Sequence, residues 1–169
     1  MRISYAWSLD QAVHEVSPSV FSLWSLRGHD RIDDVLYVPG TYPGGLVAVD
    51  VGTGAEVFAF NTQQWLYDVK VLGRNAVVAS TTGLGVIDLD TQALTPLVPG
   101  FVSGNALFKA RDGVHAIVGD ELVQVNAAGA VASRTPHSLG SGGSPRIVDV
   151  ERDRALLLVS GQGLRWVDR

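Results

Sequence analysis

The stretch Leu-Val-Ala-Val-Asp at 46–50 returns in related form three more times, as Leu-Gly-Val-Ile-Asp at 84–88, Leu-Val-Gln-Val-Asn at 122–126 and Leu-Arg-Trp-Val-Asp at 164–168. The first three copies begin 38 residues apart, and the fourth begins 42 residues after the third. Each copy is a short run of β-forming residues that ends in Asp or Asn, which are typical of turns. β segments that recur at this period predict an all-β protein, a β-propeller in which each repeat forms one blade.

The residues around the second copy show the four strands of one blade most clearly. Apolar runs at 65–71, 76–80, 84–88 and 93–98 are separated by turns rich in Gly, Asn, Asp and Thr. Short apolar runs between such turns are typical of successive hairpins. Equivalent runs lie at 20–25, 35–38, 45–50 and 56–61 in the first repeat, at 106–110, 114–118, 121–126 and 130–133 in the third, and at 146–150, 155–160 and 164–168 in the fourth.

The fourth repeat lacks a fourth strand, and the N-terminus has a spare one. Residues 2–8 place Ile3, Tyr5 and Trp7 on one face of an extended chain, which is the pattern of a half-buried strand. We therefore expect residues 1–169 to form one domain, a four-blade propeller that the N-terminal strand closes by completing the last blade, so that no sheet edge is exposed. The alternative is a half-ring that pairs with a second copy to form eight blades.

Composition narrows the class of protein. With 169 residues, 46% of them apolar, the chain is long enough for one sizeable core. The absence of Cys excludes disulfides and thiolate chemistry. A net charge of −4 without a Lys/Arg cluster argues against a nucleic-acid partner. We find no apolar segment of signal-peptide or membrane-spanning length, and we therefore expect a cytoplasmic protein without a membrane partner.

Two stretches resemble known propeller repeats. Residues 46–60, Leu-Val-Ala-Val-Asp-Val-Gly-Thr-Gly-Ala-Glu-Val-Phe-Ala-Phe, resemble the blade repeat of quinoprotein-type propellers, and residues 84–97 resemble that of YVTN-type propellers. The resemblance implies a propeller fold, although these families usually have more blades than four. The tryptophan docking motif of quinoproteins does not recur regularly in this chain, so the resemblance implies no bound cofactor.

Two sets of polar residues have structural explanations. Asp50, Asp88, Asn126 and Asp168 share one repeat position, where their side chains can accept hydrogen bonds from turn N–H groups. A ring of calcium ligands is the alternative, but one oxygen-bearing side chain per blade is sparse for calcium, and we expect no metal site. The polar run 28–34 predicts a solvated turn between the first two strands of blade one.

Ligand binding is expected on one face of the propeller. The connections between blades share a face with the loops between second and third strands, so residues far apart in sequence converge there. We predict a binding site on this face formed by His14, Tyr42, Gln64, Trp65, His137 and Ser144.

No catalytic pair or cofactor motif is evident in the sequence. The function predicted is therefore non-catalytic binding of a protein or small-molecule ligand, by a monomer or homodimer. One alternative is a small enzyme at the channel mouth with His14 or His137 as the acid–base group. Another is a structural subunit of a larger assembly.

Overall fold

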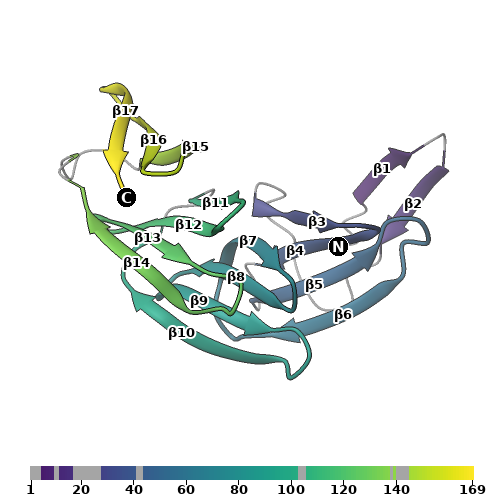
Figure 1. The fold of residues 1–169 in the computed structure, drawn as a ribbon. Coiled ribbons are helices and arrows are strands. Elements are labelled where there is room, and N and C mark those ends of the chain that lie inside the picture. The colour runs from purple at the N-terminus through teal and green to yellow at the C-terminus, as the bar shows by residue number, and fades with distance from the viewer. Residues whose placement is uncertain are drawn as a thin grey trace.

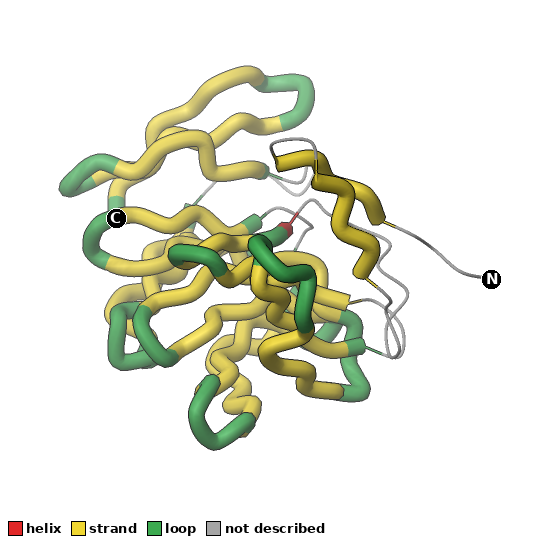
Figure 2. The backbone as a smooth tube through the Cα atoms, turned by 90° about the vertical axis from the view of Figure 1, so that its right-hand side faces the viewer, coloured by secondary structure: helices red, strands yellow, loops and turns green. Residues whose placement is uncertain are grey.

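The computed structural model describes residues 5–9, 12–16, 28–40, 44–102, 106–137, 139 and 145–169, and for the first two ranges it describes the backbone alone. Strands joined by short turns make up nearly all of the described residues (Figure 2). Among the described residues no helix has the length and apolar character needed to cross a bilayer.

From β3 onward the strands form four consecutive antiparallel sheets, and each sheet is built from strands that follow one another in sequence. The first sheet comprises β3 (Asp30–Ile32), β4 (Val35–Gly40), β5 (Gly45–Asp50) and β6 (Glu56–Asn61), and the second β7 (Leu66–Leu72), β8 (Asn75–Ser80), β9 (Gly83–Asp88) and β10 (Ala93–Pro99). The third comprises β11 (Leu107–Ala110), β12 (Gly113–Val118), β13 (Glu121–Val125) and β14 (Val131–Pro136), and the last β15 (Arg146–Val150), β16 (Arg154–Val159) and β17 (Gly163–Asp168).

The strands of the second, third and last sheets lie within a few residues of the runs expected from the sequence. Turn chemistry explains this agreement, because several strands begin at a glycine that no other residue can replace. Gly83 and Gly113 open β9 and β12 with φ angles of +139° and +147°. A Cβ at either position would collide with the backbone carbonyl oxygen of Val98 or Val125.

Apolar layers join each sheet to the next. Leu46 of the first sheet packs with Val78 of the second, and Val77 of the second sheet packs with Val123 of the third. Ile117 of the third sheet lies in the same cluster as residues of the last sheet. Because successive side chains in a strand point to opposite faces, neighbours such as Val77 and Val78 serve two different layers.

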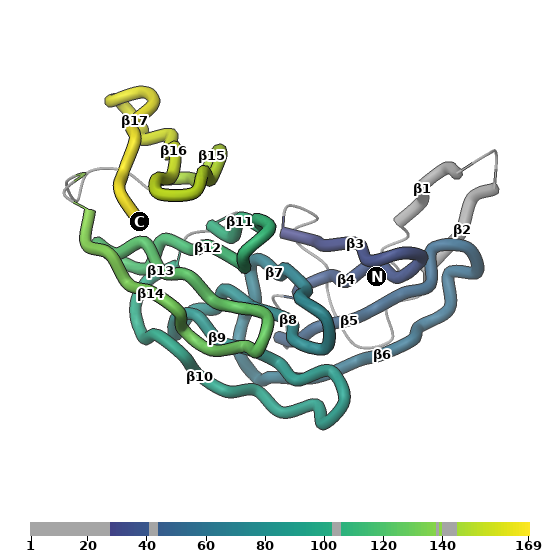
Figure 3. The backbone as a smooth tube through the Cα atoms, in the orientation of Figure 1, coloured from purple at the N-terminus to yellow at the C-terminus, as the bar shows by residue number. Residues whose placement is uncertain are grey.

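The four sheets follow one another along an open arc (Figures 1 and 3). The last sheet stands at one end of the arc, and a hairpin of β1 (Tyr5–Leu9) and β2 (Ala12–Val16) lies at the other end. This hairpin forms its own two-stranded sheet, and β17 pairs with β16. The expectation that the N-terminal strand completes the last sheet is therefore wrong in this structure: β2 is the pairing partner of β1.

The first sheet also differs from expectation. Its first strand is β3, within the polar run 28–34 that the sequence assigned to a turn, and only Asp33 and Asp34 form the turn to β4. The predicted strand at 20–25 lies outside the described residues. The polar run was assigned to a turn because polar residues are typical of turns. In the structure Asp30 lies in a strand, and its side chain binds the neighbouring sheet.

Candidate functional site

The first strands of the four sheets lie side by side on the inner side of the arc. β7 contacts both β3 and β11, and β11 contacts β15 (Figure 1). Since each of these strands forms one edge of its sheet, polar residues from distant parts of the sequence gather here.

Asp68 of β7 is the buried carboxylate of this inner surface, with 1% of its area exposed. Its Oδ2 accepts a hydrogen bond from the Leu107 backbone N–H at 3.0 Å, and its Oδ1 accepts bonds from the Val69 N–H at 2.9 Å and Lys70 Nζ at 3.0 Å. Burial raises the pKa of Asp68, and the positive charge of Lys70 opposes that rise. Asp68 therefore joins the second sheet to the third while holding a cation beside it.

Asp30 of β3 makes the equivalent bond between the first and second sheets. Its Oδ1 accepts the N–H of the next residue, Arg31, at 3.0 Å, and its Oδ2 accepts the Val71 N–H at 2.7 Å. Lys109 of the third sheet also donates to Asp30 Oδ2, at 3.1 Å. In both sheets one carboxylate oxygen binds locally and the other binds the inner strand of the following sheet. We call these contacts the inter-sheet aspartate bonds.

A cleft of about 400 Å³ lies where these inner strands meet the last sheet. Its polar lining includes Lys70 and Arg146, and the Arg146 side chain makes no ion pair or hydrogen bond with another described residue. Its apolar lining includes Phe108, Val148 and Leu158. A free guanidinium beside apolar walls suits an anionic group attached to an apolar body.

Part of the cleft lining lies at strand ends next to the connections between sheets, and part lies in the middle of β7. Arg146 and Leu107 are the first residues of β15 and β11, immediately after the connections between sheets. Leu158 is near the end of β16, before the turn to β17. Of the six residues predicted from the sequence to bind a ligand, the structure describes the side chains of three: Gln64, Trp65 and His137.

Gln64 and Trp65 lie together beside the turn between β8 and β9. Gln64 Oε1 accepts a hydrogen bond from Thr82 Oγ1 at 2.9 Å, and the Trp65 carbonyl accepts the Thr81 N–H at 3.2 Å. Half of the Trp65 surface is exposed. Gln64 also lines a second groove of about 470 Å³ over the second sheet, between β8 and β10.

His137 occupies the equivalent place beside the turn between β12 and β13, where its N–H donates to the Asp120 carbonyl at 2.8 Å. The side chain is buried, and burial lowers its pKa. Neither ring nitrogen has a hydrogen-bond partner among the described residues. Such a ring is poorly placed to act on a substrate at the surface. The backbone of His14 lies in β2 but its side chain is not described, and Tyr42 and Ser144 lie outside the described residues.

A second polar cluster, which no sequence motif predicted, lies at the opposite ends of the strands. His115 of β12 is fully buried, and its Nε2 lies 3.2 Å from Asp112 Oδ1. Arg169 also hydrogen-bonds Asp112. Burial lowers the pKa of His115; for Asp112 burial acts upward, but bonds from Arg169 and His115 hold its pKa at about 2. This cluster anchors the C-terminal residue of the chain to the third sheet.

The shared turn position has the structural role expected from the sequence. Asp50 Oδ1 accepts the Thr53 N–H at 2.7 Å, Asp88 Oδ1 accepts the Thr91 N–H at 2.9 Å, and Asn126 Oδ1 accepts the Ala128 N–H at 3.0 Å. These bonds fix the turn after the third strand of three sheets.

The residues that line the inner cleft were not predicted from the sequence, because they share no motif. One signal was available: Asp68 and Lys70 are two residues apart in a strand and so lie on one face, next to apolar neighbours. A register shift between Leu66 and Asp68 locally changes the pairing of β7. Which strand would lie opposite that face was a question of tertiary structure.

This chain is similar in fold to solved structures but matches no known protein family. No protein-family model and no curated protein sequence matches this chain. Among solved structures, it is similar to the computationally designed Ika8 protein (TM-score 0.64, 11% identity, 94% of this chain and 50% of that one) and to BamB from Moraxella catarrhalis (TM-score 0.64, 18% identity, 94% of this chain and 52% of that one). It is also similar to the designed Ika4 protein, with a TM-score of 0.61 and 11% identity over 89% of this chain and 97% of that one.

These likenesses show an all-β fold with sheets arranged as in propellers, and they agree with the resemblance of the repeats to quinoprotein-type blades. The chain spans about half the length of Ika8 and of BamB. At such low identity the likeness is one of fold and carries no activity.

Proposed function

We propose that this chain is a non-catalytic binding module, a single domain of four propeller repeats, that recognises a protein or small-molecule ligand on the face carrying the connections between sheets. The observation that carries the proposal is the inner cleft. It places Arg146, which has no ion-pair partner in the part of the chain that the structure describes, beside the apolar walls of Phe108 and Leu158. The cleft favours a ligand with an anionic group and an apolar body. Propeller-like neighbours of varied kinds support a binding or scaffold role in general.

The residues predicted from sequence belong to the same proposal as contacts around the cleft: His14, Tyr42, Gln64, Trp65, His137 and Ser144. Of these, Trp65 supplies an exposed aromatic surface and Gln64 lines the groove over the second sheet. His137 contributes through the position of its loop, since its ring is buried.

A pair of matched probes tests the cleft. Benzoate carries a carboxylate on an apolar ring, whereas benzamide has the same shape without the charge. In ¹⁵N NMR titrations we expect benzoate to shift the amide signals of Phe108, Arg146 and Ile147, and we expect benzamide to leave them nearly unchanged. The charge on Arg146 provides this difference.

The control compares two arginines of the last sheet. Arg146→Gln should abolish the benzoate shifts, whereas Arg165→Gln should leave them intact, because Arg165 does not line the cleft. If benzoate produces no shifts, or if its shifts persist in Arg146→Gln, the cleft is not an anion-binding site and the proposal fails.

A further inference from the structure

The charged residues of the inner cleft differ in what they already bind. The described residues that line the cleft include three charged side chains, Asp68, Lys70 and Arg146, which together carry a net charge of +1. Asp68 and Lys70 form an ion pair with each other, with Oδ1 and Nζ 3.0 Å apart. The cleft therefore holds one neutral pair and one guanidinium that has no ion-pair partner among the described residues.

Lys70 has no proton left for a ligand. An ammonium group has three N–H bonds to donate. Those of Lys70 point to Asp68 Oδ1 at 3.0 Å, to the His29 carbonyl oxygen at 3.0 Å and to the Val69 carbonyl oxygen at 3.1 Å. Asp68 is 1% exposed, so a ligand that drew Lys70 away would leave a buried carboxylate without its cation, which is costly. Lys70 therefore neutralises Asp68 and is not available to a ligand.

Arg146 is the cation that remains. It is exposed at the start of β15, and its side chain makes no hydrogen bond or ion pair within the described part of the chain. The planar guanidinium presents paired N–H groups that match the oxygens of one carboxylate or similar oxyanion. The connections that precede β11 and β15, residues 100–105 and 138–144, contain no charged residue and so supply no second cation.

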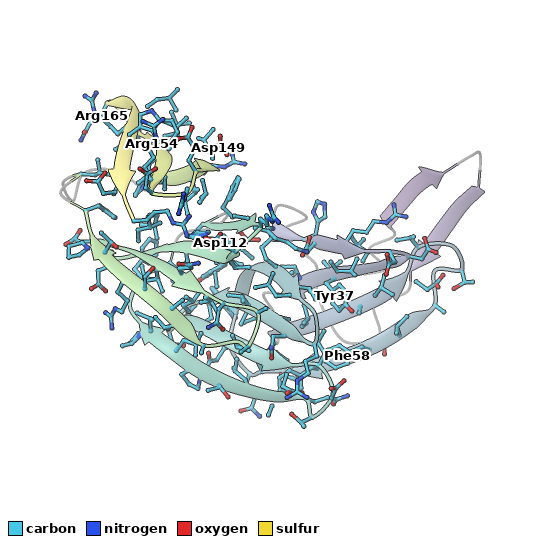
Figure 4. All side chains as sticks on the ribbon, in the orientation of Figure 1. Tyr37, Phe58, Asp112, Asp149, Arg154 and Arg165 are labelled. Carbon is cyan, nitrogen blue, oxygen red and sulfur yellow. The ribbon has the colours of Figure 1, made fainter. Side chains whose placement is uncertain are left out.

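The other described arginines of the last sheet are placed elsewhere. Arg154 lies over the Trp166 ring, 4.2 Å from its centroid, and Arg169 hydrogen-bonds Asp112. Arg165 lies on β17, the strand of this sheet farthest from the inner strands (Figure 4). None of these arginines lines the cleft, so Arg146 is its single available positive charge among the described residues.

We infer that the cleft selects ligands with one negative charge, such as a carboxylate or a sulfate ester on an apolar body, and rejects dianions such as phosphate monoesters. This inference rests on the proposed function and adds the charge class of the ligand. Arg146 neutralises one negative charge. A second negative charge would leave water without a cation to meet it, in a cleft that Asp68 also lines, and this costs free energy.

Two phenyl esters of the same shape test the inference. Phenyl sulfate carries one negative charge, whereas phenyl phosphate carries nearly two at about pH 7.5. In ¹⁵N NMR titrations of the full chain, both esters are followed through the amide signals of Phe108, Arg146 and Ile147. We expect the dissociation constant of phenyl sulfate to be at least ~10-fold lower than that of phenyl phosphate.

A variant with a second cation should reverse this selectivity. Val148 lines the cleft and is 44% exposed, so Val148→Lys adds a free ammonium to the cleft wall without burying it. We expect this change to lower the dissociation constant of phenyl phosphate ~10-fold. Val57→Lys makes the same substitution at an exposed position of β6, outside the cleft, and should leave the ratio of the two constants unchanged.

Phenyl phosphate that binds the wild-type chain as tightly as phenyl sulfate overturns the inference. A ratio that Val148→Lys leaves unchanged overturns it too, because a second cation should then have mattered. In both cases benzoate binding through Arg146 can persist, and the proposed function stands without the charge rule. If neither benzoate nor phenyl sulfate produces shifts, the proposed function and this inference both fail.

Discussion

The second strand of the second sheet and the second strand of the last sheet are similar in sequence but differ in burial. β8 reads Asn-Ala-Val-Val-Ala-Ser and is buried at all six positions, whereas β16 reads Arg-Ala-Leu-Leu-Leu-Val and is buried at alternate positions. β8 lies between two sheets, and β16 has a sheet on one side only. The burial of these two strands differs because neighbouring sheets lie against both faces of β8 and against one face of β16.

The largest difference in stability between the second and last sheets is expected when an aspartate of the inner strand is mutated. Asp68→Ala should destabilise the protein by about 3 to 5 kcal/mol, because it leaves Lys70 and the Leu107 N–H without their buried acceptor. Asp149→Ala should cost far less, since its bond to Val150 is exposed. Urea unfolding measures both. Equal losses would contradict the assigned role of the inter-sheet aspartate bonds.

Neighbouring core residues should show the next largest difference. Leu157→Ala should cost about 2 to 4 kcal/mol, and Leu158→Ala less than about 1 kcal/mol, because only Leu157 is fully buried. In β8, Val77→Ala and Val78→Ala should be costly to a similar extent, at about 2 kcal/mol each, since both faces are covered. A strong effect of Leu158→Ala would mean that the exposed face of the last sheet is covered in solution.

Acid should weaken the third sheet through His115. Burial lowers its pKa in the folded protein, so the unfolded chain binds the proton more readily. The stability that depends on neutral His115 is therefore present above about pH 6.5 and is lost as the pH falls through the lower folded pKa. Thermal melting between pH 7 and pH 5 should show this loss, and His115→Gln should make it smaller. An unchanged slope in the variant would show that His115 does not control it.

The smallest effect concerns the shared turn position. Asn126→Ala should cost about 1 kcal/mol through lost bonds to the Ala128 and Ala130 N–H groups. Asp168→Ala, at the same repeat position of the last sheet, should have almost no effect, because no described residue donates a hydrogen bond to its side chain. Melting temperatures should be the same with calcium and with chelator. A rise with calcium would favour a metal site at this position.

The repeat in the sequence predicted most of the strands, and local physics explains the success. Turn residues such as Gly83, Asp88 and Asn126 act within a few residues of themselves, so spacing alone placed the hairpins of three sheets. The same reasoning predicted the side chain–backbone bonds after the third strand. The placement of Gln64 and Trp65 beside the β8–β9 turn also agrees with the expected topology, while their role in binding remains a proposal.

Contacts between sheets were beyond the reach of the sequence. The sequence placed Asp30 in a turn and predicted no role for Asp68. The residues that bind their side chains, Val71 and Leu107, are about 40 residues away in the chain, so no local pattern shows these contacts. The exposure of Leu158 and Leu164 on the last sheet depends on how the sheets are placed, which the alternation of residues does not encode. The sequence by itself determined a repeated β-blade of known strand order, since strands and turns are local. Only the tertiary structure decided where the cleft lies, which carboxylates are buried and whether the arc meets its own beginning, because these depend on residues brought together from different repeats.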